Sequence, residues 1–456
     1  MGSLVAGIIS QGSPSEIRQR QWEALSQVLF HRARPVKYGK DNGKPCRRYY
    51  FTGRGARCLA MTEIKLGRIP HSLPRRSNSP RRNAVKTGTK TGAFRTGTLF
   101  SGIHFGMDDW GNVKFDFSMP ADIFTVEEEI ASPKSERHHV VILGAGASRA
   151  AFQFGDRNGQ KLPVIKDFVE VVGLAGLLTT NGINPPFDNF ESIYSDIATD
   201  TSKAALQKEI GKRVYDYFAA LKLPDTPTLY DHLILSLRPK DVVATFNWDP
   251  FLWNAAARNR HFSEPPDLLF LHGNVAIGHC PDCKLVLCRS HDCPQCGHPL
   301  VASPLLYPVK QKNYQSDPAI SAHWSRLESM LKSAWTITFF GYGAPETDVE
   351  AIRLLMNGWG NPEKRLMEET EIIDIRPEGD LTTTWKPFIH SHHYSICGSF
   401  YDSTIAKHPR RSCEALWERN AGARFMNGGT DFPNSMDFYS LYNWLEPRIA
   451  AEQDTQ

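Results

Sequence analysis

A run of apolar, mostly β-branched residues that leads directly into two glycines constrains the fold of this chain most. Residues His138 to Leu143 are followed by Gly144-Ala145-Gly146-Ala147-Ser148. Such a run is typical of a buried parallel strand that ends in a tight turn, where a helix begins. Glycines let the backbone approach a phosphate closely, and a helix N-terminus offers N–H groups with a partial positive charge. The segment therefore predicts a nucleotide-binding α/β fold.

The turn lacks the features of two common phosphate-binding motifs. A dehydrogenase-type dinucleotide site has a third glycine three residues after the second, and this chain has Arg149 there. The acidic residues about twenty positions further on, Asp167 and Glu170, lie in a helix-like run and not at a strand end. A kinase-type loop needs Gly-Lys-Ser/Thr, which is absent. We therefore expect a dinucleotide-binding loop that belongs to neither of these two classes.

Further apolar segments also end in polar residues or glycines. In an open parallel sheet, the carboxyl ends of the strands share one edge, and ligands bind there. We therefore expect the polar residues that end these segments to converge on one crevice. The segments are Val242–Asp249, which contains Asn247; Leu268–Gly273, which contains His272; Thr336–Gly343, which contains Gly341; and Glu371–Ile375, which contains Asp374.

Taken together, these segments resemble the sirtuin superfamily, in particular its bacterial sirtuin-like NAD-consuming branch, over residues 138–400. Gly144–Ser148 matches the cofactor loop of the family. Asn247 and Asp249 match the Asn and Asp of its Gln-Asn-Ile-Asp segment, and His272 with its following glycine matches the catalytic histidine. The resemblance implies a Rossmann-like, doubly wound parallel sheet with a small zinc-knuckle module and a helical module.

The chain departs from sirtuin deacylases at two places. Their Gly-Ile-Pro-Asp-Phe-Arg segment is replaced by Arg149–Gly159, and their Gly-Thr-Ser becomes Gly341-Tyr342-Gly343. Neither change removes the parts that bind and cleave NAD. The resemblance therefore implies an NAD+ hydrolase that releases nicotinamide and ADP-ribose, and such enzymes of the family often act as effectors of anti-phage defence.

The resemblance also implies a role for each candidate residue. His272 would be the general base on a ribose hydroxyl or on water, and an ordinary histidine pKa near 6.5 suits that task. Asn247 would bind the ribose, and Asp249 the nicotinamide amide. The remaining candidates would hold the diphosphate (Gly144, Ala145, Gly146, Ala147 and Ser148) and the adenosine half (Gly341, Gly343 and Asp374), with Asp156 and Asn158 beside the same cleft.

Simpler interpretations stay open at this stage. His272 could be a structural histidine at a strand end, and Asn247 and Asp249 could be turn formers before Pro250. Asp374, which lies just before Arg376-Pro377, could equally form a turn. Two other functions remain as alternatives. They are an NAD-dependent protein deacylase and a non-catalytic module that binds NAD or ADP-ribose and carries a nucleic-acid-binding arm.

The cysteines predict a structural zinc site. Cys280 and Cys283 form one C-x2-C pair, and Cys293 and Cys296 form another. Four thiolates close a tetrahedral Zn²⁺ site and leave no open coordination position. Cys288 or His291 could replace one ligand. The chain has nine cysteines, an odd number, and its first residues lack the pattern of a secretory signal, so we expect a reducing, cytoplasmic compartment.

The net charge of +4 hides an asymmetry along the 456 residues. Residues 1–137 hold 23 Lys and Arg against 12 Asp and Glu, and the remainder holds 30 against 37. We expect a basic, partly disordered extension over 1–137 and a catalytic domain over 138–400. That domain would carry the helical module at about 160–235 and the zinc knuckle at about 278–300, and a C-terminal extension would follow over 401–456.

Several expectations concern partners. The basic extension could contact nucleic acid weakly or be a solvated arm, and its aromatic and apolar alternation over 101–127 predicts a small β-rich piece. An activating protein partner or a homo-oligomer would fit the effector role that the resemblance implies. No apolar run is long enough to span a membrane, so we expect no membrane association.

Overall fold

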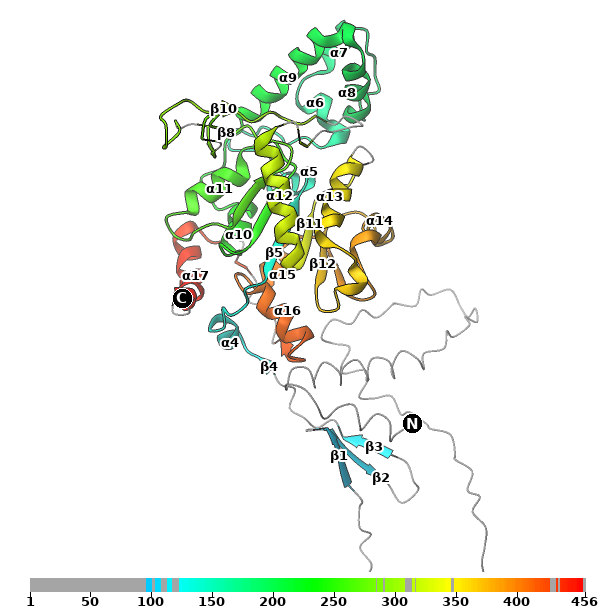
Figure 1. Cartoon of the computed structure of the whole chain (residues 1–456), viewed down its shortest axis with the longest axis vertical. Helices are drawn as coiled ribbons and strands as arrows, with labels where there is room; N and C mark the ends of the chain where they lie inside the picture. The colour runs from blue at the N-terminus through cyan, green and yellow to red at the C-terminus, as the bar shows by residue number, and fades with distance from the viewer. Residues whose placement is uncertain are drawn as a thin grey trace, which may run out of the picture. The chain divides into compact units, whose positions relative to one another are not determined.

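A computed structural model gives the fold of the chain (Figure 1). It describes the strands within residues 96–116 and then residues 123–453, except for 284, 290–291, 308–313, 316, 346–347, 427–431 and 434. Residues 1–95 of the basic extension and His291 lie outside these described residues. The chain divides into two compact units, of which the larger comprises Phe124–Gly422 and Met426–Gln456.

The smaller unit contains a three-stranded antiparallel sheet. Its strands are β1 (Thr96–Phe100), β2 (Ile103–Met107) and β3 (Val113–Asp116), and each pairs with the next in the chain. The β-rich piece that the aromatic alternation predicts is therefore confirmed. Two further strands, β4 (Ile123–Phe124) and β14 (Phe425–Met426), are two residues long each and pair with each other.

The larger unit is built on a six-stranded sheet in which every neighbouring pair is parallel. The order is β13-β12-β11-β5-β6-β7. From β5 the chain adds β6 and β7 on one side and then returns to the other side of β5 with β11, so the direction of winding reverses between β5 and β11. The doubly wound sheet is confirmed. The strands are β5 (His138–Leu143), β6 (Val242–Thr245), β7 (Asp267–Phe270), β11 (Ala334–Phe340), β12 (Glu369–Ile373) and β13 (Tyr394–Cys397).

Helices cover both faces of this sheet because successive strand side chains point to opposite faces. In β5, Val140 and Ile142 belong to one apolar core, whereas Val141 and Leu143 belong to the other. The first core is completed by α12 (Pro318–Ser333), α13 (Val349–Trp359) and α14 (Glu378–Thr384). The second is completed by α5 (Ala145–Ala151), α10 (Leu229–Leu235), α11 (Phe251–Asn259), α15 (Thr404–Lys407) and α17 (Phe438–Gln453).

Two inserted modules lie beyond the end of the sheet at which α5 begins (Figure 1). The helical module contains η1 (Ile165–Asp167), α6 (Phe168–Val171), α7 (Ala175–Thr180), α8 (Phe190–Thr199), η2 (Thr201–Lys203) and α9 (Ala204–Ala219). The second module is a small antiparallel sheet of β8 (Ile277–His279), β9 (Val286–Cys288) and β10 (Val301–Ala302).

The residues that flank the predicted catalytic domain pack into the same unit as the sheet. Arg411 is fully buried, and it donates to the backbone carbonyls of Glu129 and Ile130 at the end of α4 (Val126–Ile130). Arg410 and Arg411 both pair with Glu452 near the end of α17. The other short elements are η4 (Pro362–Lys364), η5 (Lys386–Phe388), η6 (Phe400–Asp402) and α16 (Ser412–Asn420).

Among the described residues, no helix is both long and apolar enough to cross a bilayer.

Candidate functional site

The glycines after β5 and β11 let two turns pack against each other where the winding reverses. The N–H of Gly144 donates to Phe340 O at 3.0 Å, and the N–H of Gly146 donates to Gly341 O at 2.9 Å. A Cβ on Gly146 would lie 2.8 Å from Gly341 Cα, and Gly341 itself has a φ of +60°. Side chains are therefore excluded from this junction. Gly343 differs, since a Cβ there would meet no atom within 4 Å.

Ser148, which is buried, and Asn247, which is half-buried, meet in one cluster beside this junction. Asn247 Nδ2 donates to Gly144 O and to Ser148 Oγ, both at 2.9 Å. Ser148 Oγ donates to Asp249 Oδ2 at 2.6 Å and also bonds to the hydroxyl of Tyr230 at 2.6 Å. The fold thus brings together three residues that the sequence assigns to the site, from α5 and from the loop after β6.

Asp249 is a buried carboxylate without a cationic partner among the described residues. It is 4% exposed, and its acceptor contacts are the Ser148 hydroxyl and the N–H of Phe251. Burial raises the pKa of Asp249 to about 6, although the hydrogen bonds from Ser148 and Phe251 act in the opposite direction. Its backbone carbonyl accepts from Asn274 Nδ2 at 2.6 Å, which fixes the loop. A carboxyl group with such a pKa can change its charge near neutral pH.

His272 lies at the same edge of the sheet as Asn247. The register pairs Thr245 of β6 with Phe270 of β7, and Asn247 and His272 each lie two residues beyond that pair. His272 is 7% exposed, and its Nε2 forms a hydrogen bond with the hydroxyl of Tyr314 at 3.0 Å. The ring of Phe246 packs against it with 4.7 Å between centroids and an interplanar angle of 72°. The Asn-x-Asp and His-Gly segments therefore share one edge, as the parallel topology predicts.

Two other predicted residues are engaged in local structure. Asp374 follows β12, and its carboxylate accepts from the N–H of Arg376 and pairs with the Arg376 guanidinium at 2.9 Å. Asp156 is buried and accepts from the N–H groups of Asn158, Gln160 and Lys222. Both carboxylates therefore organise the loops that contain them. Of the small residues in the cofactor loop, Ala147 is buried and its N–H donates to Gly144 O, whereas Ala145 is exposed.

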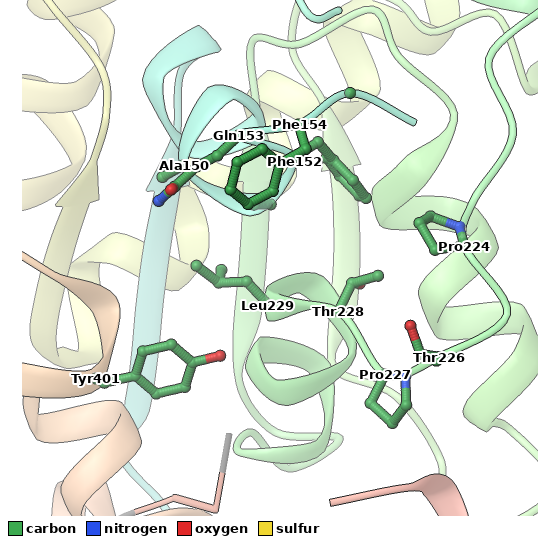
Figure 2. A pocket seen from close by; sticks show the side chains of 12 residues that line it. Ala150, Phe152, Gln153, Phe154, Pro224, Thr226, Pro227, Thr228, Leu229 and Tyr401 are labelled. Atoms are coloured by element: carbon green, nitrogen blue, oxygen red, sulfur yellow. The ribbon is translucent and has the colours of Figure 1, made fainter. Parts of the chain in front are cut away.

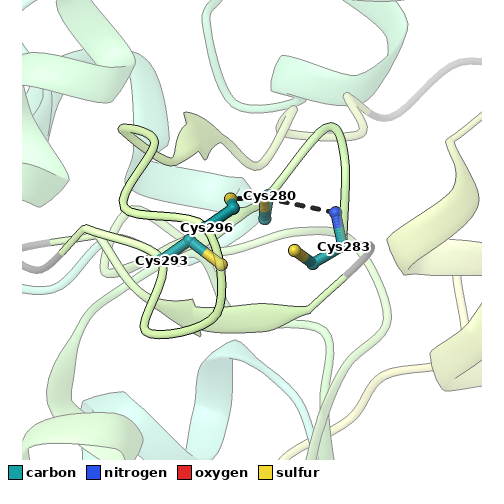
Figure 3. A group of neighbouring side chains, drawn as sticks. All are labelled: Cys280, Cys283, Cys293 and Cys296. Carbon is teal, nitrogen blue, oxygen red and sulfur yellow. Dashed lines mark hydrogen bonds between the residues drawn. The ribbon is translucent and has the colours of Figure 1, made fainter.

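The four predicted metal ligands converge on one point (Figure 3). The sulfurs of Cys280, Cys283, Cys293 and Cys296 all lie within 4.8 Å of one another. A tetrahedral zinc with Zn–S bonds of about 2.3 Å would separate its sulfurs by about 3.8 Å. The N–H of Cys283 donates to Cys280 Sγ, and tight turns bring each pair together. The donor set fits a closed zinc site. Cys288 is not part of this group.

Three contributors to the site carry no recognisable sequence motif. Tyr230 is fully buried in α10, and its hydroxyl bonds to Ser148 Oγ and accepts from Asn247 Nδ2 at 3.3 Å. Asn274 supports the Asn-x-Asp loop, and Tyr314 contacts the histidine. Tyr230 follows Thr228, which forms a capping box with Asp231, so the sequence signals only a helix start there.

Two cavities lie outside this cluster. One, of about 290 Å³, is lined by residues at the end of α5, by the loop before α10 and by Tyr401 (Figure 2). Phe154, at its rim, is 94% exposed. The other, of about 380 Å³, is lined by Arg149, Lys161, Asp167 and neighbouring residues. Neither cavity is lined by Asn247, Asp249 or His272.

Comparisons with known proteins give structural likeness only. A mutant Sir2 homologue in complex with ADP-ribose is 15% identical and has a TM-score of 0.35; the match covers 64% of this chain and 97% of the other. A Sir2 homologue in complex with NAD is 15% identical, with a TM-score of 0.33 and coverages of 63% and 93%. At these scores the match is too loose to transfer site residues by superposition. No family model matches the chain, and a comparison with curated proteins gives no match.

Proposed function

We propose that this chain is an NAD+ hydrolase that releases nicotinamide and ADP-ribose. One observation carries the proposal. Ser148, Asn247 and Asp249 form a hydrogen-bonded cluster beside the point where the winding of the sheet reverses, and His272 lies just after the strand next to β6, at the position that matches Asn247 in the register. Ligands of open α/β sheets bind at this position. The Sir2 homologues of similar fold, in complex with NAD and with ADP-ribose, are consistent with this ligand.

The chemistry explains why an amide and a carboxylate belong here. When the glycosidic bond of NAD breaks, the bonding electron pair leaves with the nicotinamide nitrogen, and positive charge develops on C1′ of the ribose. Catalysis requires contacts that are stronger in this transition state than in the bound substrate. In our proposal the Asp249 carboxylate accepts from the carboxamide N–H of nicotinamide, and Asn247 binds the ribose hydroxyls. When NAD binds, Asp249 and Asn247 each give up a hydrogen bond to a protein group and form one to the substrate instead.

His272 completes the reaction as a proton acceptor. A water molecule adds to C1′ as the C1′–N bond breaks, and its released proton passes to the imidazole. Nicotinamide leaves as a neutral molecule, and ADP-ribose retains the oxygen of the water. Neutral imidazole is a suitable acceptor near pH 7. Because His272 is nearly buried, the proton transfer takes place away from bulk water.

Incubation of the purified chain with NAD alone tests the proposal. We expect equal amounts of nicotinamide and ADP-ribose by chromatography, and we expect His272→Gln to lower kcat by about 10² to 10⁴. His323→Gln is the matched control, because His323 is a half-buried histidine whose hydrogen-bond partners among the described residues are backbone atoms of Phe270. Nicotinamide release that requires an acylated peptide would instead indicate a deacylase. NAD binding without any release would indicate a non-catalytic module.

We also propose that the four cysteines hold one structural Zn²⁺. Their sulfurs surround a single point, and four thiolates leave no position for substrate. We expect one zinc per chain by elemental analysis and its loss in Cys280→Ser. Cys288→Ser, which changes a thiol outside the cluster, should retain the metal. Full zinc content in the Cys280→Ser variant would contradict this assignment.

The biological setting that we propose follows the sirtuin-like NAD-consuming branch. There the chain is a cytoplasmic anti-phage effector whose depletion of NAD is accelerated by a protein partner or by homo-oligomer formation, and its basic residues 1–137 touch nucleic acid. Nicotinamide release measured with and without added DNA or RNA, at two salt concentrations, tests the nucleic-acid contact. Identical rates and no salt-dependent binding would show that these residues are a solvated arm.

A further inference from the structure

The neighbours of His272 fix both the orientation of its ring and the partner of one ring nitrogen. Its ring lies nearly parallel to that of Tyr314, with an interplanar angle of 15° and 5.7 Å between centroids. The ring of Phe246 packs against it at a steep angle, and Trp324 contacts both Phe246 and Tyr314. The hydroxyl of Tyr314 reaches Nε2 of His272 at 3.0 Å. The imidazole is therefore held by aromatic packing and by a hydrogen bond to one defined ring nitrogen.

The direction of that hydrogen bond follows from the chemistry of the phenol. Tyr314 is 2% exposed, and burial, with the nearby negative charges of Asp348 and Glu350, raises its pKa above the ordinary value of 10.0. The phenol therefore keeps its proton at neutral pH and can donate it. A buried hydroxyl hydrogen needs an acceptor, and the lone pair on Nε2 of His272 lies within hydrogen-bond distance. If Nε2 accepts, the neutral ring carries its proton on Nδ1.

We infer that Tyr314 is a positioning residue that fixes the tautomer and the plane of His272, so that Nε2 is the nitrogen that takes up the proton during NAD cleavage. This inference rests on the proposed function and adds a residue to it. The hydroxyl hydrogen can rotate about the C–O bond of the phenol. The lone pair on Nε2 then becomes available to accept a hydrogen bond from an arriving water or ribose hydroxyl, and the imidazole ring does not need to move. Without the phenol oxygen, Nε2 loses the donor that favours its proton-free state.

Tyr314→Phe removes the hydroxyl and retains the stacked ring. We expect kcat for nicotinamide release to fall by about tenfold to a hundredfold, less than the loss of the base itself, with KM changed by less than about threefold. Tyr307→Phe is the matched control, because Tyr307 is a half-buried tyrosine whose hydroxyl donates to Gly211 O. Both kinetic constants should stay within about twofold of the parent in that variant, since its lost bond is to a backbone carbonyl of α9 and not to the His272 ring.

A second readout does not depend on activity. In protein labelled with ¹⁵N-histidine, the proton-bearing and lone-pair ring nitrogens have separate chemical shifts, and His272→Gln assigns the signal. We expect the parent, without substrate, to show the proton on Nδ1 and the lone pair on Nε2, and Tyr314→Phe to show a larger share of the tautomer with the proton on Nε2. A proton on Nε2 in the parent would overturn the inference even if Tyr314→Phe does not fold.

The two readouts separate the possible failures. If the parent does not hydrolyse NAD but shows the expected tautomer, the proposed function fails and the Tyr314–His272 bond stands as a structural feature. If the parent hydrolyses NAD, and Tyr314→Phe changes neither the nitrogen shifts nor kcat, the positioning role alone is wrong.

Discussion

β6 has a buried aspartate at each end, and the protein treats the two carboxylates in opposite ways. Asp241, just before the strand, is 3% exposed and accepts from the N–H groups of His139 and Arg238 and from Lys240 Nζ at 2.8 Å. Burial raises its pKa, but Lys240 and the backbone donors outweigh this effect, so the pKa of Asp241 is lowered. Asp249, just beyond the strand, is equally buried but has hydroxyl and N–H donors only, and its pKa is raised to about 6.

This difference separates a structural carboxylate from a functional one. A fold that needs only stability supplies a cation to a buried acid, as it does for Asp241. Retaining Asp249 without a cation costs free energy, and such unpaired, strongly shifted groups gather where a ligand supplies the missing partner. The same strand therefore provides its own internal control for the proposed site.

The largest expected difference between the two aspartates is in catalysis. Asp249→Asn should lower kcat/KM for nicotinamide release by about 10² to 10³, because it removes a contact to the leaving group in a site that excludes water. Asp241→Asn should leave the rate per folded molecule unchanged. Steady-state kinetics normalised to the folded fraction measure both. Equal losses in the two variants would remove the functional distinction between the two ends of β6.

The two substitutions should change the free energy of unfolding in opposite directions. Asp241→Asn breaks a buried ion pair and should lower the free energy of unfolding by about 3 kcal/mol at pH 8. Asp249→Asn should raise it at pH 8 by at most about 3 kcal/mol, because the folded protein no longer buries an ionised carboxylate. Denaturant melts at constant salt test both effects, and a strong destabilisation by Asp249→Asn at pH 8 would contradict the raised pKa.

The pH dependence sharpens this test. The pKa of Asp249 is raised in the folded state, so its contribution to stability is present below the ordinary value of 3.8 and is lost as the pH rises towards about 6. The advantage of Asp249→Asn should therefore grow between pH 4 and 6 and stay constant above that range. The pKa of Asp241 is lowered in the folded state, so the pH dependence of its contribution to stability has the opposite sign. This contribution is present at neutral pH and is lost as the solution is acidified.

A smaller effect is expected at the junction between β5 and β11. Gly146→Ala should destabilise the fold by about 1 to 3 kcal/mol, because the added methyl group meets the backbone of Gly341 at 2.8 Å. Gly343→Ala should change stability by less than about 0.5 kcal/mol, since nothing lies near its Cβ position. Equal melting temperatures for the two variants would show that the two turns are not packed as described.

The smallest effect is expected for Asp374→Ala. Its carboxylate is already paired with Arg376, so a turn role predicts less than about a threefold change in KM for NAD. A rise in KM of more than about tenfold would instead assign Asp374 to the adenosine ribose, as the sequence suggests, because that is the cost of a hydrogen bond to a ligand hydroxyl.

The sequence predicts the apolar strands of the sheet well, including β7 at one edge, and it misses the mixed strand β13 at the other edge. Buried parallel strands appear as continuous apolar runs, which is why β5, β6, β7 and β11 can be recognised. β13 has the mixed sequence Tyr394–Cys397 and lies half-buried at an edge, so no pattern marks it. β12 begins at Glu369, two residues before the predicted start at Glu371, and the Glu369 carboxylate pairs with Arg419. Glu371 lies inside the strand and accepts from Thr404 N and Thr338 Oγ1.

For the site, sequence motifs indicate the residues at strand ends but not those that approach from elsewhere. Asn247, Asp249 and His272 follow recognisable strands, so topology alone brings them to one edge. Tyr230 and Tyr314 reach the cluster from a helix and from a loop, at sequence separations that no motif fixes. The supporting contacts of the site therefore required a structure.

A structure of the His272→Gln variant with NAD tests the central claim most directly. Our account predicts that the nicotinamide carboxamide lies at Asp249, that the adjoining ribose lies between Asn247 and residue 272, and that the diphosphate lies near the turn at Gly144. A dinucleotide bound in the cavity between α5 and Tyr401, out of reach of these three residues, would contradict the account.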